Sequence, residues 1–115
     1  MEIIRIYPEN ASKKQVYDLT MNPKNQKLSI CEGQRLEIRA WCRYADVDED
    51  SGELRELFSI QTPEGEVYAS NSPTVWREFE KMVDIFGPDG VTAIDVVSGE
   101  SKNGRKFFTV CYAGE

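Results

Sequence analysis

The sequence predicts a mainly β domain with one helix, and three observations indicate this fold class. Several runs alternate apolar and polar residues at period two, which is typical of strands with one buried face. One longer segment carries apolar residues at helical spacing between a serine and a glycine. The chain has 115 residues, of which 40% are hydrophobic. This length and composition fit a single domain over residues 1–115 with a core of its own.

The strands are expected to follow an N-terminal extended segment over residues 1–26, which includes a turn at residues 22–25. Gly33 is expected to form either a bulge in one long bent strand or a turn between two strands. The Asn103-Gly104 pair is a strong hairpin signal between the last two strands. Five strands are predicted over residues 27–44, 54–62, 66–70, 91–98 and 105–112.

One helix is expected over residues 72–87. Ser72 is a suitable N-cap, and Pro73 fits the first helical position because its missing N–H is not needed there. Gly87 suits the residue that follows the last turn, and Pro88 prevents continuation. The apolar stripe of this helix consists of Val75, Phe79, Met82, Val83 and Phe86.

Three strands, a helix and a final hairpin follow one another in the order of the OB-fold, a small five-stranded barrel. We therefore predict an OB-fold-like barrel with an N-terminal extension. A roll or a sandwich with a helix on one side would give a similar order of elements.

The composition excludes several classes of function. The chain has no histidine, which removes the commonest general base and the commonest zinc ligand. Its three cysteines are dispersed, as in a reduced cytosolic protein. We expect no enzyme, no cofactor and no metal site. No apolar run is long enough for a membrane span, and no secretion signal is visible. We therefore expect the protein to be located in the cytoplasm.

The net charge of −6 is unevenly distributed. Residues 1–44 carry a net +3, residues 45–66 a net −7, and residues 67–115 a net −2. The acidic segment includes "DVDED" at residues 46–50, but Ser51 and Leu57 stand where a calcium-binding EF-hand loop requires glycine and glutamate. We interpret it as a solvated acidic loop.

The run "RLEIRAWCRY" at residues 35–44 places a tryptophan among three arginines on one strand face. Cations that follow phosphates, together with flat side chains that stack on bases, are what a sequence-tolerant binder of single strands needs. Trp41 could instead pack under residues 1–21, with the arginine side chains along it. The predicted phosphate contacts and stacking residues are Arg35, Arg39, Trp41, Arg43, Tyr68, Lys102, Arg105, Lys106 and Phe107.

Two motifs carry a resemblance to a known family. These are Ala69-Ser70-Asn71-Ser72 before the helix and Ser101-Lys102-Asn103-Gly104-Arg105 in the last hairpin. With them, the sequence resembles small single-stranded DNA-binding proteins of phages and mobile elements of Gram-positive bacteria. The resemblance covers roughly the last half of the chain. It implies an OB-like, sequence-tolerant binder of single-stranded DNA, with contacts to DNA from Lys102 and Arg105.

This resemblance implies a role in replication or recombination of phage or mobile-element DNA inside a bacterial host cell. Replication or recombination proteins would then be partners, and a homodimer or cooperative assembly on DNA is compatible with the sequence. A second function stays open. The acidic segment over residues 45–66 could make the chain a protein-binding module, either a DNA-mimic inhibitor or a replisome adaptor.

Overall fold

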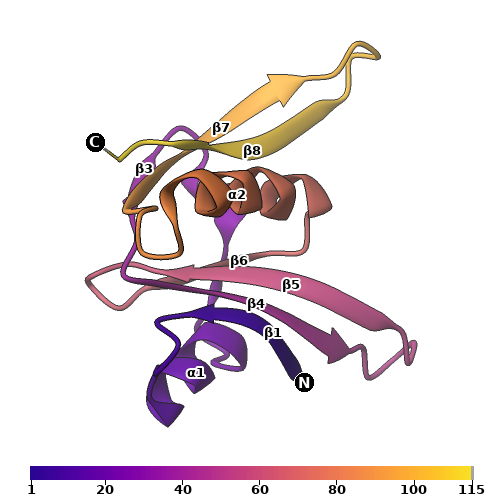
Figure 1. Cartoon of the computed structure of the whole chain (residues 1–115). Helices are drawn as coiled ribbons and strands as arrows, with labels where there is room; N and C mark the ends of the chain where they lie inside the picture. The colour runs from indigo at the N-terminus through magenta and orange to yellow at the C-terminus, as the bar shows by residue number, and fades with distance from the viewer. Residues whose placement is uncertain (115) are drawn as a thin grey trace.

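Two sheets and two α-helices make up the fold in the computed structural model, which describes residues 1–114 (Figure 1). The larger sheet has the order β1-β4-β5-β6-β2, with strands β1 (Glu2–Tyr7), β4 (Ala40–Val47), β5 (Leu54–Gln61), β6 (Val67–Ser70) and β2 (Gln26–Lys27). The smaller sheet consists of β3 (Arg35–Glu37), β7 (Ala93–Glu100) and β8 (Lys106–Tyr112). Neighbouring strands are antiparallel, except that β2 and β6 are parallel. The prediction of a mainly β chain is confirmed.

Helix α2 (Pro73–Phe86) lies between the two sheets (Figure 1). The Ser72 hydroxyl caps its first turn by accepting a hydrogen bond from the Val75 amide. The helix ends at Gly87, whose φ of 84° is one that residues with a side chain rarely adopt. The helix predicted over residues 72–87 is therefore confirmed.

The main core forms where α2 meets both sheets. Phe79 and Val75 of α2 have no exposed surface. They pack in one cluster with side chains from the larger sheet, such as Phe58, and from the smaller sheet, such as Ile94 and Val96. Burial of these apolar side chains is the main force that holds the two sheets on the helix.

A second helix, α1 (Lys13–Thr20), replaces part of the extended segment predicted over residues 1–26, so that prediction is wrong here. Ser12 caps it by accepting a backbone N–H. Leu19 is fully buried, and its carbonyl accepts a hydrogen bond from the Ser59 hydroxyl at 2.6 Å. A helix of eight residues is marginal by itself in water, so these contacts with the sheet stabilise it.

The first strand predicted over residues 27–44 is divided in the structure, so the alternative of one long bent strand is wrong. The chain passes from β2 into the 3₁₀-helix η1 (Leu28–Cys31), then into β3 and β4. Gly33 has a φ of 82° and forms part of the turn before β3. As a result, the two parts of this segment belong to different sheets: β3 pairs with β7 of the smaller sheet, and β4 pairs with β5 of the larger sheet.

The two sheets remain open, so the closed five-stranded barrel is not confirmed. Within residues 1–114, β6 pairs with β5 and β2, and β8 pairs with β7 only. No ladder joins β6 to β8. The hairpin of β7 and β8 forms as predicted, with Gly104 at a φ of 75° in its turn.

Candidate nucleic-acid interface

Trp41 is buried, so the prediction that it lies on a solvent-facing strand surface is wrong. Its ring has no exposed surface and lies 5.3 Å from the Phe79 ring, centroid to centroid. Its indole Nε1 donates a hydrogen bond to the Pro88 carbonyl at 3.1 Å. Helix α2 covers this face of β4, and α1 covers the other, so both faces of the strand are buried. A ring without exposed surface cannot stack on a base in this conformation.

The three predicted arginines do not share one strand face, because Arg35 lies on β3, Arg43 lies on β4 and Arg39 lies between the two strands. Arg35 on β3 forms a bidentate pair with Asp95, at 2.8 Å from Nε and 3.1 Å from the terminal nitrogen. Hydrogen bonding in this pair lowers the pKa of Asp95 and raises that of Arg35. Arg39 is exposed between β3 and β4. Arg43 on β4 is paired with Glu56, and its side chain is only 12% exposed.

Tyr68 faces the core, which corrects its prediction as a stacking residue. It is 8% exposed, and its hydroxyl donates a hydrogen bond to the Glu66 carboxylate. This bond, together with burial, raises the pKa of Tyr68. The ring belongs to the main core cluster. Its cross-strand neighbour on β5, Ile60, belongs to the same cluster.

The hairpin of β7 and β8 keeps its predicted cations on the surface. Lys102, Arg105 and Lys106 are exposed, and none of them forms an ion pair with another described residue. Phe107 is 43% exposed and lies directly over Gly99, where an added Cβ would come within 2.8 Å of its ring. These residues can therefore meet a ligand without rearrangement.

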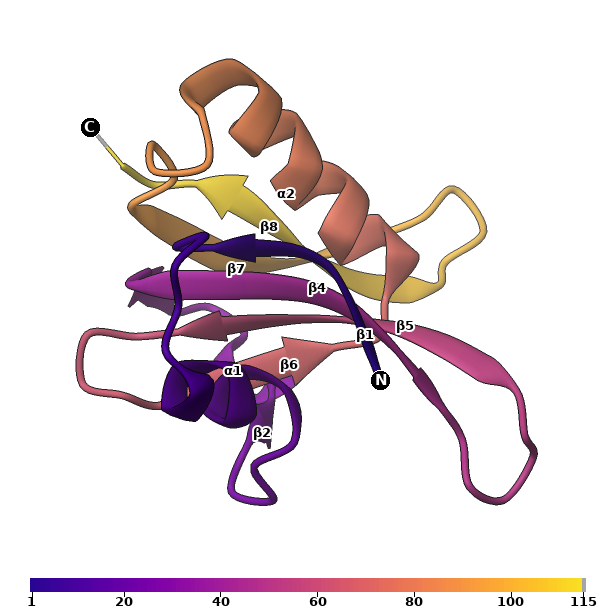
Figure 2. The ribbon, with the colours of Figure 1, turned by 60° about the horizontal axis from the view of Figure 1, so that its bottom comes forward.

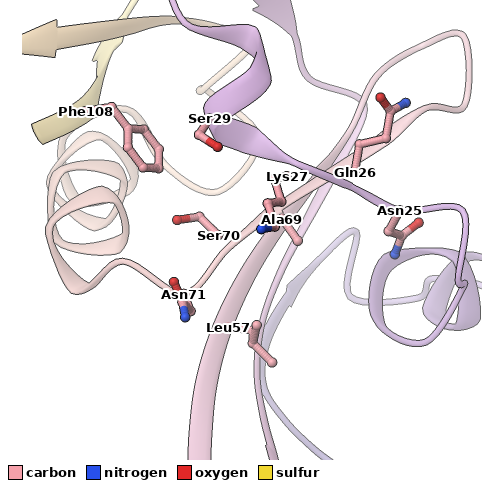
Figure 3. Close-up of a pocket in the computed structure, with 9 residues that line it drawn as sticks. All are labelled: Asn25, Gln26, Lys27, Ser29, Leu57, Ala69, Ser70, Asn71 and Phe108. Carbon is pink, nitrogen blue, oxygen red and sulfur yellow. The ribbon is translucent and has the colours of Figure 1, made fainter.

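A groove lies between β8 on one side and β2 with the end of β6 on the other (Figure 3). It has a volume of about 350 Å³, and Phe108 stands at one end of it, with Lys27 and Ala69 further along. Lys27 is exposed and without an ion pair among the described residues, and Phe108 is partly exposed. The lining residues are Asn25, Gln26, Lys27, Ser29, Leu57, Ala69, Ser70, Asn71 and Phe108.

A second hollow of about 360 Å³ shares Ser70 and Asn71 with the groove. Its other lining residues are Arg43, Leu54, Glu56, Ser72 and Pro73. The segment at Ser70-Asn71 is therefore the border between two adjoining depressions. It is also part of the short motif before α2.

Sequence reasoning missed the groove residues for two reasons. Phe108 shares a strand face with Val110 and Tyr112, a pattern that indicates a core residue, and it does pack partly against the main core, so the pattern does not show that it also lines a groove. Lys27 lies at the start of the strand predicted over residues 27–44, and nothing in that pattern distinguishes it. The motif at Ser70-Asn71 is the one available signal, and the pattern alone does not show that a groove opens beside it.

The acidic loop forms the tip of the hairpin of β4 and β5. The Asp48 carboxylate accepts hydrogen bonds from the backbone amides of Asp50 and Ser51, and these bonds lower its pKa. Arg55 lies 3.7 Å from the same carboxylate. Both hairpin tips extend toward the same side of the molecule, and their ends stay apart in both views (Figures 1 and 2). The carboxylates of this tip are therefore on a different hairpin from Lys102, Arg105 and Lys106.

Exposed cations beside an open groove on a mainly β domain are typical of nucleic-acid-binding proteins. Among the described residues, no helix could span a membrane, and no group of three or more side chains could hold a metal ion.

A family model described as phage single-stranded DNA-binding protein, of the Phi29 type, matches residues 8–112. The chain therefore belongs to this family and binds single-stranded DNA as a phage protein. No curated protein and no solved structure matches the chain.

Proposed function

We propose that the protein coats single-stranded DNA without reading its sequence during phage DNA replication. The strand would lie along the groove at Ser70-Asn71 and continue over the hairpin of β7 and β8. The observation that carries this proposal is the gap between β6 and β8, which places an exposed lysine and a partly exposed phenylalanine in one groove.

Electrostatic attraction supplies most of the binding in this proposal. Lys27, Lys102, Arg105 and Lys106 are exposed cations without carboxylate partners in residues 1–114, so they are available for phosphates. Each such contact releases a counterion from the DNA, which makes affinity fall as salt rises. Phe108 would stack on a base, with Phe107 as a second platform at the hairpin. Stacking of this kind contributes ~1–3 kcal/mol per base.

We also propose that the chain is an open variant of the OB-fold. Three pairings support this: β3 with β7, β4 with β5, and β5 with β6, as if β3 and β4 were one bent first strand. OB-folds bind single strands across their second and third strands, which correspond here to β5 and β6. The outer face of these strands carries α1, with Leu19 packed beside Val67. The ligand would therefore lie in the groove beside β2 and the end of β6 rather than on that face.

The protein would act by binding alone, with no chemical step, in the cytoplasm of the bacterial host. Replication or recombination proteins would meet it on the coated strand.

The experiment is a titration of a fluorescently labelled dT oligonucleotide at several salt concentrations, followed by anisotropy. The variant carries Lys102→Ala, Arg105→Ala and Lys106→Ala. We expect weaker binding and a shallower salt dependence, by about one unit of slope for each phosphate contact that is lost. Phe108→Leu should weaken binding with an unchanged slope, because it removes stacking but no charge.

Lys13→Ala is the matched control, since Lys13 is an exposed lysine on α1, on the opposite side of the larger sheet from α2. Wild-type affinity and slope in the triple variant would contradict the proposed role of the hairpin.

A further inference from the structure

Arg43 lies between a tryptophan ring and a carboxylate at the second hollow. Its guanidinium carbon is 4.7 Å from the centroid of the Trp76 ring, a cation–π contact. The same guanidinium donates a hydrogen bond to the Glu56 carboxylate. Glu56 is 53% exposed, whereas Arg43 is 12% exposed. The carboxylate thus covers an oriented cation from the solvent side.

The packing of Trp76 explains why this cation is oriented. Trp76 lies in the first turns of α2 and is partly buried, with its ring 5.4 Å from that of Phe58 and 6.1 Å from that of Trp41. The ring is fixed by the core, and the guanidinium rests on it. A cation held in this way is pre-organised for a planar, bidentate partner such as a carboxylate or a phosphate.

Apolar surface lies next to this cation. Leu54 lines the same hollow and is 68% exposed, and its cross-strand neighbour Val47 is 52% exposed. Large apolar side chains that are left exposed beside a buried charge suit a ligand with both an apolar and an anionic part. A nucleotide has both, since its base is flat and its phosphate is charged.

We infer that this hollow is a nucleotide subsite whose phosphate position is occupied by Glu56 in the absence of DNA. On binding, a phosphate of the strand replaces the Glu56 carboxylate on Arg43, and the adjoining base lies against Leu54. Because the hollow shares Ser70 and Asn71 with the groove, the strand continues from one to the other. This inference rests on the proposed function and adds an acidic residue that restrains DNA binding.

The main test is Glu56→Gln, measured with the labelled dT oligonucleotide. It removes the competing carboxylate, so the Kd should fall by about two- to five-fold, as expected when one partly exposed ion pair is released. Glu56 is on the surface, so the variant should fold. The control is Glu78→Gln, which removes the same charge from another glutamate–cation pair, with Lys81 on α2. The control should bind as wild type does.

Arg43→Gln supplies the other side of a double-mutant cycle. Alone, it should weaken binding and reduce the salt slope by about one. Combined with Arg43→Gln, the Glu56→Gln change should no longer tighten binding beyond the Glu78→Gln control. Tighter binding that persists without Arg43 would overturn the subsite, because it would show a general charge effect.

Trp76 gives an independent signal, because it is the partly exposed tryptophan and Trp41 is fully buried. Intrinsic fluorescence should change when a DNA phosphate replaces the Glu56 carboxylate on Arg43, and Trp76→Phe should remove that change.

Equal DNA affinities in wild type, Glu56→Gln and Arg43→Gln would overturn the proposed subsite. They would not affect the proposed roles of the groove and of the hairpin of β7 and β8 in DNA binding. Failure of the wild type to bind DNA at low salt would instead defeat the proposed function itself.

Discussion

Trp41 joins the larger sheet to helix α2 and to the loop that follows the helix. It packs in the same cluster as Phe79, and its indole donates to the Pro88 carbonyl. The Arg5 guanidinium lies 5.7 Å from its ring centroid, at the edge of β1. The buried ring of Trp41 therefore contacts β1, α2 and the loop after α2, all of which are distant from β4 in sequence. This placement gives Trp41 a structural role rather than a DNA contact.

Trp41→Ala should therefore destabilise the fold rather than change DNA binding directly. Loss of a fully buried large aromatic side chain costs about 3–5 kcal/mol in the free energy of unfolding. The change also leaves the Pro88 carbonyl without its donor. Urea denaturation followed by circular dichroism measures this cost. Trp76→Phe, which keeps a ring at a partly exposed position, is the comparison and should cost much less. An equal, small cost for both variants would contradict the buried role of Trp41.

The three cysteines should differ strongly in reactivity. Cys42 is fully buried, and burial raises its pKa to about 12, while burial also raises the pKa of Cys31. The thiolate is the nucleophile, so both thiols stay protonated and unreactive at pH 8. Cys111 is exposed. One thiol should react quickly with an alkylating reagent in the folded protein and three in urea, as mass spectrometry would show. Rapid modification of Cys42 under native conditions would disagree with this packing.

At the scale of elements, the two helices show what a sequence pattern can and cannot predict. The signals that predict helix α2 all lie within or next to the segment itself: the N-cap Ser72, Pro73 at the first helical position, the apolar stripe and the terminal Gly87. Its prediction from the sequence therefore succeeds. Helix α1 has one fully buried residue, Leu19, in eight, and its stabilising partners lie on β4, β5 and β6. Its conformation depends on tertiary contacts, which a local pattern does not contain.

Helix α1 should contribute to stability without contributing to DNA binding. Leu19→Ala removes the fully buried side chain of α1, and such changes cost about 2–5 kcal/mol. The affinity of the folded variant for dT oligonucleotide, measured well below its unfolding temperature, should equal that of wild type. Tyr17→Ala, at a residue of α1 that is 50% exposed, is the control and should leave stability nearly unchanged. A large loss of DNA affinity in folded Leu19→Ala would place the strand across α1 instead of the groove.

At the scale of the whole molecule, the candidate interface depends on how the two sheets fail to close. The sequence is sufficient to predict the hairpin of β7 and β8, because Asn103-Gly104 and the cations around it are local features. It was insufficient for the groove, since the missing ladder between β6 and β8 is a property of the complete fold. The same separation of elements explains how a chain with a net charge of −6 can bind DNA. The carboxylates of residues 45–53 lie on one hairpin, and the unpaired cations Lys102, Arg105 and Lys106 lie on another.

Three aspartate carboxylates accept side-chain or backbone hydrogen bonds within the fold. Asp95 accepts hydrogen bonds from Arg35 between β7 and β3. Asp18 of α1 accepts from Lys14 of the same helix and from Asn22, which follows it, and Asp48 accepts from backbone amides in the acidic turn. These hydrogen bonds lower the pKa of each group below its ordinary value.

Stability should therefore decrease as the pH falls below about 4, the region in which an aspartate of the unfolded chain takes up its proton. A group with a lowered pKa in the folded state binds fewer protons there than in the unfolded chain. Its contribution is thus complete above the unfolded pKa and is lost as the pH falls through the folded pKa. Urea midpoints measured from pH 7 to pH 2.5 should show this loss, and Asp95→Asn should make it smaller. Asp84→Asn, at an exposed carboxylate of α2 with no ion pair among the described residues, should keep the wild-type pH dependence. Identical profiles for Asp95→Asn and wild type would show that the pair with Arg35 does not stabilise the contact between β3 and β7.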